Sequence, residues 1–171
     1  MYLFLDTEFI PKSSTSPVRL LSLGLCSERG HEFYRELALP PDALPAAEEN
    51  EFIRTKVLPQ MGTQPQSVAE PAVIARDLAA WLDTLDASEL EVCYDFHVDY
   101  DLFEELLTLI APPTVATLCP THVGYLNEDD DLESAAAACF ASLELERGLH
   151  RHHALADALA LRAKFWAAHG R

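Results

Sequence analysis

Two acidic residues, Asp6 and Glu8, stand two positions apart where the first apolar run of the chain ends. Side chains alternate between the two faces of a strand, so these carboxylates are expected to point in the same direction. Two carboxylates on one face repel each other unless a proton or a cation lies between them, and Mg²⁺ and Mn²⁺ take oxygen ligands of this kind. The pair alone is equally consistent with a polar loop that follows the strand.

A second acidic group follows the apolar run of residues 90–94. Asp99 and Asp101 stand where helical spacing begins, over residues 100–110. An aspartate at a helix start is commonly an N-cap. The alternative is a carboxylate that faces a cation at the same edge of the sheet as Asp6, and the local pattern leaves both interpretations open.

A histidine and an aspartate form the third group. A helix is predicted over residues 153–169; His152 directly precedes it, and Asp157 lies in its first turn. An acid at a helix start complements the helix dipole. Histidine, whose ordinary pKa is close to neutrality, is also well suited to general-base catalysis. Each of the three groups is a weak signal when it is taken alone.

The elements that must position these residues follow from apolar periodicity and turn residues. Strands predicted over residues 2–9, 18–26 and 31–38 are joined by short polar connections, which is typical of an antiparallel meander. Further strands are predicted over 90–94 and 114–118, and helices over 48–58, from Pro71 to Leu85, and over 100–110, 132–143 and 153–169. This order predicts an α/β fold in which helices cover a mixed sheet, as a single domain over residues 1–171.

Composition limits the partners that the chain is expected to have. The formal net charge is −16, which argues against a protein that clamps long nucleic-acid duplexes by neutralising their phosphates. No apolar run reaches the roughly 18 residues of a membrane-spanning helix, and the first residues lack the basic segment of a signal peptide. We therefore expect a cytoplasmic protein without a membrane partner.

Taken together and in this order, the three groups resemble the motifs of the DEDDh exonucleases, a branch of the ribonuclease-H-like superfamily. The family motifs D-x-E, N-x-x-F-D-x-x-F-L and H-x-x-x-x-D are matched here by residues 5–9 (LDTEF), 95–103 (DFHVDYDLF) and 152–157 (HHALAD). The resemblance extends from residue 3 to about residue 165. The chain is also similar to a small bacterial group of stand-alone exoribonucleases, through DTEFI at 6–10, FIRTKVLP at 52–59 and PPTV at 112–115.

The resemblance implies a ribonuclease-H-like fold, with three antiparallel strands followed by parallel strands and covered by helices. It implies that two divalent cations, Mg²⁺ or Mn²⁺, are held by four carboxylates, and that a histidine acts as the base. The implied metal ligands are Asp6, Glu8, Asp99 and Asp157, the implied base is His152, and the implied substrate-binding residues are Thr7 and Phe9. Phe9 either stacks on the terminal base of a substrate or belongs to the core.

The implied activity is that of a 3′–5′ exoribonuclease. It would release nucleoside 5′-monophosphates from the 3′ ends of short or overhanging single-stranded RNA, as a homodimer. A DNA-directed exonuclease of the same family is an alternative, and so is a catalytically silent binding module with this fold. A phosphohydrolase of the haloacid-dehalogenase type fits less well, because that family requires an aspartate at the position of Glu8.

Some positions depart from the family pattern or compete with one another. The asparagine that is usual in the second motif is replaced by Asp95, which adds a negative charge beside the expected metals. Asp101 competes with Asp99, and the register of the following Leu-Phe pair favours Asp99. His153 competes with His152, but only His152 stands five residues before the aspartate of the third motif. Among the few cations that could follow a substrate backbone, those just before the third motif are favoured, Arg147 and Arg151.

Overall fold

Six strands form one mixed sheet, in the order β4-β3-β2-β1-β5-β6. The computed structural model describes residues 1–12, 17–40, 43–110 and 117–170. The strands are β1 (Tyr2–Ile10), β2 (Arg19–Ser27), β3 (Glu32–Leu37), β4 (Val68–Ala69), β5 (Glu89–Tyr94) and β6 (Thr117–His122). The α-helices are α1 (Leu44–Glu49), α2 (Pro71–Thr84), α3 (His97–Leu107), α4 (Asp130–Arg147) and α5 (Ala154–Ala168).

The first three strands form the antiparallel half of the sheet. β1 pairs with β2 and β2 pairs with β3, both antiparallel. Gly30, with φ +87°, lies in the turn between β2 and β3 and takes a backbone conformation that residues with a Cβ rarely adopt. The predicted meander is therefore confirmed. The connection between β1 and β2 includes residues 13–16, which lie outside the described part of the chain.

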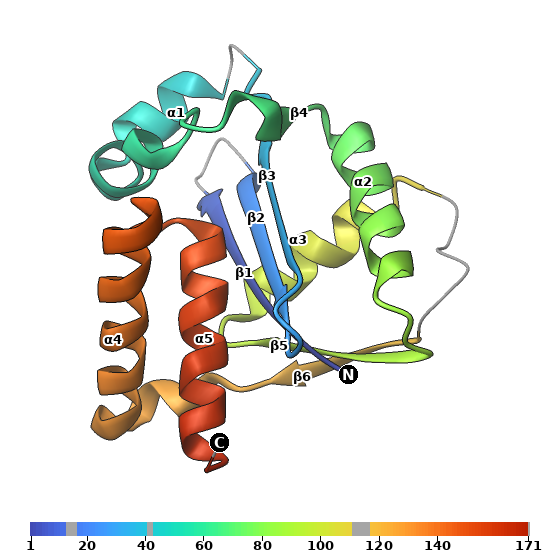
Figure 1. Ribbon diagram of the computed structural model, residues 1–171. Coiled ribbons are helices and arrows are strands. Elements are labelled where there is room, and N and C mark those ends of the chain that lie inside the picture. Colours follow the sequence, from blue (N-terminus) through green and yellow to red (C-terminus); the bar gives the residue numbers. More distant parts are fainter. Residues whose placement is uncertain (13–16, 41–42, 111–116, 171) are drawn as a thin grey trace.

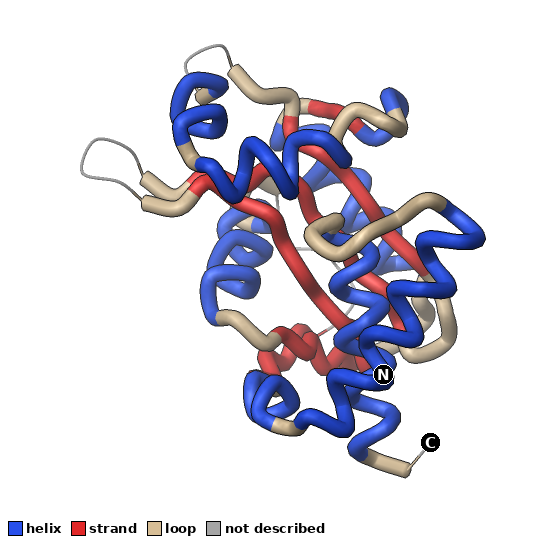
Figure 2. The backbone as a smooth tube through the Cα atoms, turned by 90° about the vertical axis from the view of Figure 1, so that its left-hand side faces the viewer, coloured by secondary structure: helices blue, strands red, loops and turns tan. Residues whose placement is uncertain are grey.

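Helices cover both faces of the sheet, because the strands are apolar on both sides. Leu3 and Leu5 belong to a core cluster that includes residues of α2 and α3, whereas Phe4 belongs to a cluster that includes residues of α4 and α5. Figure 1 shows α4 and α5 on one side of β1–β3 and α2 and α3 on the other. The view turned by 90° also shows helices on both sides of the strands (Figure 2). This is the expected α/β fold, with a mixed sheet flanked by helices that is compatible with the ribonuclease-H-like class.

In the parallel half of the sheet, the register determines which residues of β1 and β5 lie side by side. β5 pairs in parallel with both β1 and β6, and Phe4 of β1 lies opposite Cys93 of β5. Two residues further along each strand, the same register leads to Asp6 and Asp95. β5 ends at Tyr94 whereas β1 continues to Ile10, so Asp6 lies in the middle of β1, beside the carboxyl end of β5, and not at a strand end as its place after the first apolar run predicts.

One helix prediction is wrong in its extent. Residues 48–58 are not one helix: α1 ends at Glu49, a π-helical turn η1 spans Ile53–Val57, and a 3-10 turn η2 spans Leu58–Gln60. Asn50 explains the break, because its backbone is extended and its side-chain Oδ1 accepts a hydrogen bond from the Ile53 amide at 3.1 Å. Asparagine often competes with helical hydrogen bonding in this way.

Other boundaries also differ from the predictions. α3 begins at His97, three residues before the predicted start, with Phe96 as its N-cap. The strand predicted over 114–118 is described only from Thr117 and continues to His122, since residues 111–116 lie outside the described part. The two-residue strand β4 and the 3-10 turns η3 (Pro65–Ser67) and η4 (Gly124–Glu128) were not predicted. Among the described helices, none has the length and apolarity needed to cross a membrane.

Candidate functional site

A polar cavity of about 500 Å³ opens beside the second half of β1, at the carboxyl end of β5. All of the predicted site residues line it, and they come from β1, from the start of α3 and from the segment that enters α5. Its lining is Asp6, Thr7, Glu8, Phe9, Asp95, Phe96, Asp99, Asn127, Glu133, Ala136, Phe140, Arg151, His152, Asp157, Ala160, Leu161 and Lys164.

β1 supplies the first carboxylates, and β2 determines what can approach them. Asp6 lies opposite Gly24 of β2. A Cβ at Gly24 would lie only 2.3 Å from backbone atoms of Ala154 and Leu155, so the absence of a side chain lets the start of α5 rest directly on β2. The close approach brings the first turn of α5, with Asp157, beside the end of β1. The register of β1 also shifts between Glu8 and Phe9, and such irregularities often re-aim side chains next to functional sites.

The start of α3 supplies one more carboxylate, Asp99. Its side chain is 2% exposed, and its Oδ1 accepts a hydrogen bond from Thr7 Oγ1 at 2.6 Å. Asp99 lies in the first turn of α3 and is not the N-cap. Asp101, by contrast, is exposed and does not line the cavity. Of the two competing aspartates, the structure therefore brings Asp99 to the site.

A hydrogen bond between two residues of the third motif closes the loop before α5. The backbone amide of His152 donates a hydrogen bond to Asp157 Oδ2 at 2.7 Å, which gives a physical reason for the five-residue spacing. His152 has φ +70°, a left-handed conformation that non-glycine residues adopt only where the surrounding structure imposes it. Its ring meets the ring of Phe52 edge to face, with centroids 4.7 Å apart. The strained backbone and the ring contact fix the imidazole at the cavity.

His153 does not line the cavity. It is buried, and its ring stacks on Tyr34 with centroids 4.2 Å apart. Burial lowers its pKa to about 4, so the ring stays neutral within the core. His152 is therefore the histidine that lines the cavity.

The carboxylates strongly perturb one another. Burial, followed by repulsion from Asp157 and Asp99, raises the pKa of Glu8 to about 8. Burial is also the first cause that raises the pKa values of Asp99 and Asp157, each to about 7, and it raises that of Asp6 well above its ordinary range. The pKa of His152 is lowered by burial and then by the nearby charges of Arg151 and Lys56. Such a cluster is stabilised by added positive charge, and perturbed groups of this kind gather at functional sites.

Two sets of side chains in the cavity have the composition of a metal site. Glu8, His152 and Asp157 form one set, and within it the potential ligand atoms all lie within 4.8 Å of one another. Asp6, Asp95 and Asp99 form the other set, with the same spacing. Carboxylate oxygens with at most one imidazole fit a hard divalent cation such as Mg²⁺ or Mn²⁺. The donor chemistry therefore fits the expected pair of cations.

Several cavity residues were not predicted as site residues. From the sequence, Asp95 was only a departure from the second motif, and no role at the site was predicted for Phe96, Asn127, Glu133 or Lys164. Asp95 could have been found from the β1–β5 register, had the pairing been known. The others come from loops and helices whose approach depends on the tertiary fold.

Only one of the two favoured arginines reaches the cavity. Arg151 lines it, with its guanidinium 6.0 Å from the ring centroid of Phe140. Arg147 instead forms a two-pronged ion pair with Glu32 of β3, with N–O distances of 3.0 and 2.8 Å. The prediction that both arginines follow a substrate is therefore not supported for Arg147.

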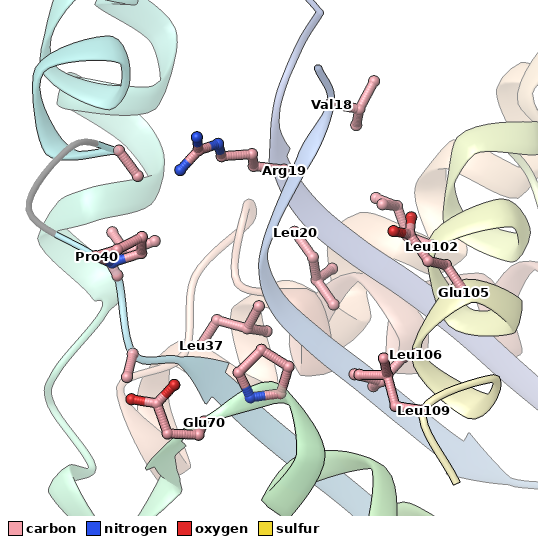
Figure 3. Close-up of a pocket in the computed structure, with 14 residues that line it drawn as sticks. Val18, Arg19, Leu20, Leu37, Pro40, Glu70, Leu102, Glu105, Leu106 and Leu109 are labelled. Carbon is pink, nitrogen blue, oxygen red and sulfur yellow. The ribbon is translucent and has the colours of Figure 1, made fainter. Parts of the chain in front are cut away.

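A second cavity, of about 590 Å³, lies on the α2–α3 side of the sheet and is mainly apolar. Figure 3 shows leucines from β2, β3 and the α3 region around this space, with the charged ends of Arg19, Glu70 and Glu105 around it. None of the metal-type sets found among the described residues lies there.

A scan against models of protein families finds no match for the chain, and a search of curated proteins finds none either. The chemistry of the site therefore has to be inferred from its own geometry.

Proposed function

We propose that the chain is a two-metal-ion 3′–5′ exonuclease that removes nucleoside 5′-monophosphates from the 3′ ends of short or overhanging single-stranded RNA. The observation that carries the proposal is the convergence of Asp6, Glu8, Asp99 and Asp157 with His152 in one cavity. These residues belong to three motifs that are far apart in the sequence and resemble those of the DEDDh exonucleases.

The four carboxylates are the proposed metal ligands. Divalent cations bound there would supply positive charge that lowers the pKa of the attacking water and stabilises the leaving oxygen. Thr7 orients Asp99 through its hydroxyl, and the His152 amide orients Asp157. Both carboxylates are thus pre-positioned, each with one oxygen already bonded, which limits the reorganisation needed when a cation binds.

His152 is the proposed general base. Its lowered pKa keeps the ring neutral near pH 7, so that a ring nitrogen can accept a proton from the attacking water. The constrained backbone and the contact with Phe52 hold the ring beside Glu8 and Asp157. A histidine that is held in place but half-buried can also pass the proton on to solvent.

The shape and charge of the cavity favour a short, unpaired substrate. The rings of Phe9 and Phe96 lie parallel, 6° apart in plane with centroids separated by 6.2 Å, and Phe96 is 55% exposed. Unpaired bases stack on such rings without regard to sequence. Arg151 and Lys164 are the only Lys or Arg residues among the described residues lining the cavity, so few backbone phosphates can be neutralised.

The preference for RNA over DNA follows from the family resemblance, and a DNA-directed activity is the alternative. Homodimer formation is likewise proposed from that resemblance, whereas a cytoplasmic location is proposed from the lack of a signal-peptide pattern in the first residues. A catalytically silent module is disfavoured because the candidate base and all four carboxylates line one cavity.

Matched 5′-labelled RNA and DNA oligonucleotides, single-stranded or with 3′ overhangs, test the proposal in the presence of Mn²⁺. We expect a ladder of products that shorten from the 3′ end, with RNA degraded faster than DNA. The control variant Asp101→Asn, which changes an exposed acid outside the cavity, should behave as the wild type. Internal cleavage, or binding without shortening, would contradict the proposal.

A further inference from the structure

We propose that Asp95 is an additional ligand of the cation that Asp6 and Asp99 hold, an inference that rests on the proposed function. The four family carboxylates would then be joined by a fifth, supplied by the residue that replaces the usual asparagine of the second motif. Asp95 would be a direct contact of the reaction centre, and the centre would hold one cation between three aspartates.

The sheet register is the first observation in favour. Phe4 and Cys93 are paired in the parallel β1–β5 ladder, so Asp6 and Asp95 lie at the same level two residues further on. Phe4 and Cys93 belong to the same core cluster, on the α4–α5 side of the sheet. Because side chains repeat with a period of two along a strand, Asp6 is directed to that same side, and Asp95 directly follows the last residue of β5. An oxygen of Asp95 lies within 4.8 Å of oxygens of Asp6 and Asp99.

A chain of polar contacts from η4, α5 and α4 holds the side chain of Asp95. Asn127 of η4 donates from Nδ2 to Asp95 Oδ2 at 3.0 Å. Lys164 of α5 donates to Asn127 Oδ1 at 2.9 Å and also pairs with Glu133 of α4. Since an ammonium group can only donate, Lys164 determines which end of the Asn127 amide faces Asp95. One carboxylate oxygen is thereby fixed, and no hydrogen bond to the other is found among the described residues, so that oxygen can bind a cation.

The backbone of Asp95 is held as well. The His122 ring nitrogen Nε2 lies 3.1 Å from the carbonyl oxygen of Asp95. A Cβ at Gly124 would lie 3.0 Å from that oxygen and 2.7 Å from His122 Cε1, so glycine allows this close packing. Both the main chain and the side chain of Asp95 are thus placed by residues outside the three motifs.

The charge of Asp95 has no direct counter-charge among the described residues. Lys164, which is 7% exposed, pairs with Glu133 and reaches Asp95 only through the neutral amide of Asn127. No ion pair to Asp95 is found in the part of the chain that the structure describes. A half-buried carboxylate next to two others, with no cation of its own, is stabilised by a bound metal ion.

The test is a calorimetric Mn²⁺ titration of the full chain, comparing wild type with Asp95→Asn and Asp101→Asn. Wild type should bind two Mn²⁺ ions, and Asp95→Asn should weaken one of the two sites by about tenfold or more. Asp101→Asn should keep both affinities, because Asp101 is exposed and lies outside the cavity. Asn127→Ala, which removes the support but not the ligand, should weaken the same site by a smaller factor.

Metal-free thermal unfolding distinguishes a ligand from a structural residue. If Asp95 is a ligand, Asp95→Asn removes a repelling charge, so the metal-free melting temperature should stay level or rise. An Asp95→Asn variant with a lower metal-free melting temperature and unchanged Mn²⁺ affinity would overturn the inference. If wild type shortens RNA and binds two Mn²⁺ ions with or without Asp95, only this inference fails. A wild type that neither binds Mn²⁺ nor shortens RNA would remove the proposed function as well.

Discussion

Two cavities of similar size lie on opposite sides of the same sheet, and they differ in almost every other respect. The apolar cavity beside α2 and α3 measures about 590 Å³, and the polar cavity beside α4 and α5 about 500 Å³. By size and apolar lining, the first would be the default binding site. The second gathers features that reduce stability, namely mutually repelling carboxylates and the left-handed His152. Unfavourable arrangements persist where function requires them, so chemistry locates the candidate site better than volume does.

The largest effect should come from a carboxylate in the polar cavity. Asp157→Asn keeps the shape of the side chain but removes a charge that the proposed cations require, so we expect turnover to fall by about a thousandfold or more. The variant should fold, because the loss of one charge relieves repulsion in the cluster. Initial rates of RNA shortening give the measurement.

The matched change on the other side is Glu105→Gln at the apolar cavity, which should leave the rate unchanged. Equal losses in Glu105→Gln and Asp157→Asn would remove the distinction between the two cavities.

Gly24 links the polar cavity to the packing of the sheet. In Gly24→Ala the new methyl group would overlap the backbone of Ala154 and Leu155, so α5 must move away from β2. We expect unfolding to become easier by about 1–3 kcal/mol or more, together with weaker Mn²⁺ binding, because Asp157 moves with α5. Urea denaturation and Mn²⁺ titration measure the two effects. Full stability in this variant would contradict the close contact between α5 and β2 at Gly24.

The pH dependence of stability should differ between the metal-free and metal-loaded protein. The pKa values of Asp99 and Asp157 rise from 3.8 to about 7, and that of Glu8 from 4.5 to about 8. The native state therefore binds more protons than the unfolded state between these limits. Stability should consequently fall as pH rises, by about 1 kcal/mol or more between pH 6 and 8.

Saturating Mn²⁺ should reduce this fall in stability with pH, because the bound ion then offsets the negative charge of the carboxylates. Denaturation midpoints at several pH values, with Mn²⁺ or with a chelator, provide the comparison. A metal-free protein whose stability rises over this range would contradict the description of the carboxylate cluster.

The smallest effect is expected in the apolar cavity. Leu109 lines it but is 52% exposed, so Leu109→Ser should change the free energy of unfolding by no more than about 0.5 kcal/mol. RNA shortening should be unaffected, since the side chain lies on the α2–α3 side of the sheet. A loss of activity in this variant would mean that the apolar cavity takes part in the function.

Local patterns predict much of the fold. The apolar strands β1 to β3 and the helix that begins at Pro71 were found from the sequence, because their signals are contained within each segment. The break at Asn50 was missed, since one side-chain hydrogen bond there outweighs the helical spacing around it. The two-residue strand β4 was missed as well, because it is too short for any periodicity.

The residues of the candidate site also divide into those that local patterns predict and those that only the tertiary fold brings together. Asp6 with Glu8, and His152 with Asp157, could be predicted because each pair belongs to one short segment. Asp95 was seen only as an irregular motif position, since its relation to Asp6 depends on the pairing of β1 with β5. Asn127 bonds to both Asp95 and Lys164, and these contacts exist only after η4 and α5 have packed together, so no local pattern predicts them.

The most direct test of the central claim is the identity of the first product. Single-stranded RNA that carries a label in its 3′-terminal nucleotide is incubated with Mn²⁺ and either wild type or His152→Ala. Wild type should release the label first as a nucleoside 5′-monophosphate, and His152→Ala should release it at least about a hundredfold more slowly. Label that first appears in longer fragments, or equal rates for the two proteins, would contradict a 3′–5′ exonuclease that uses His152 as its base.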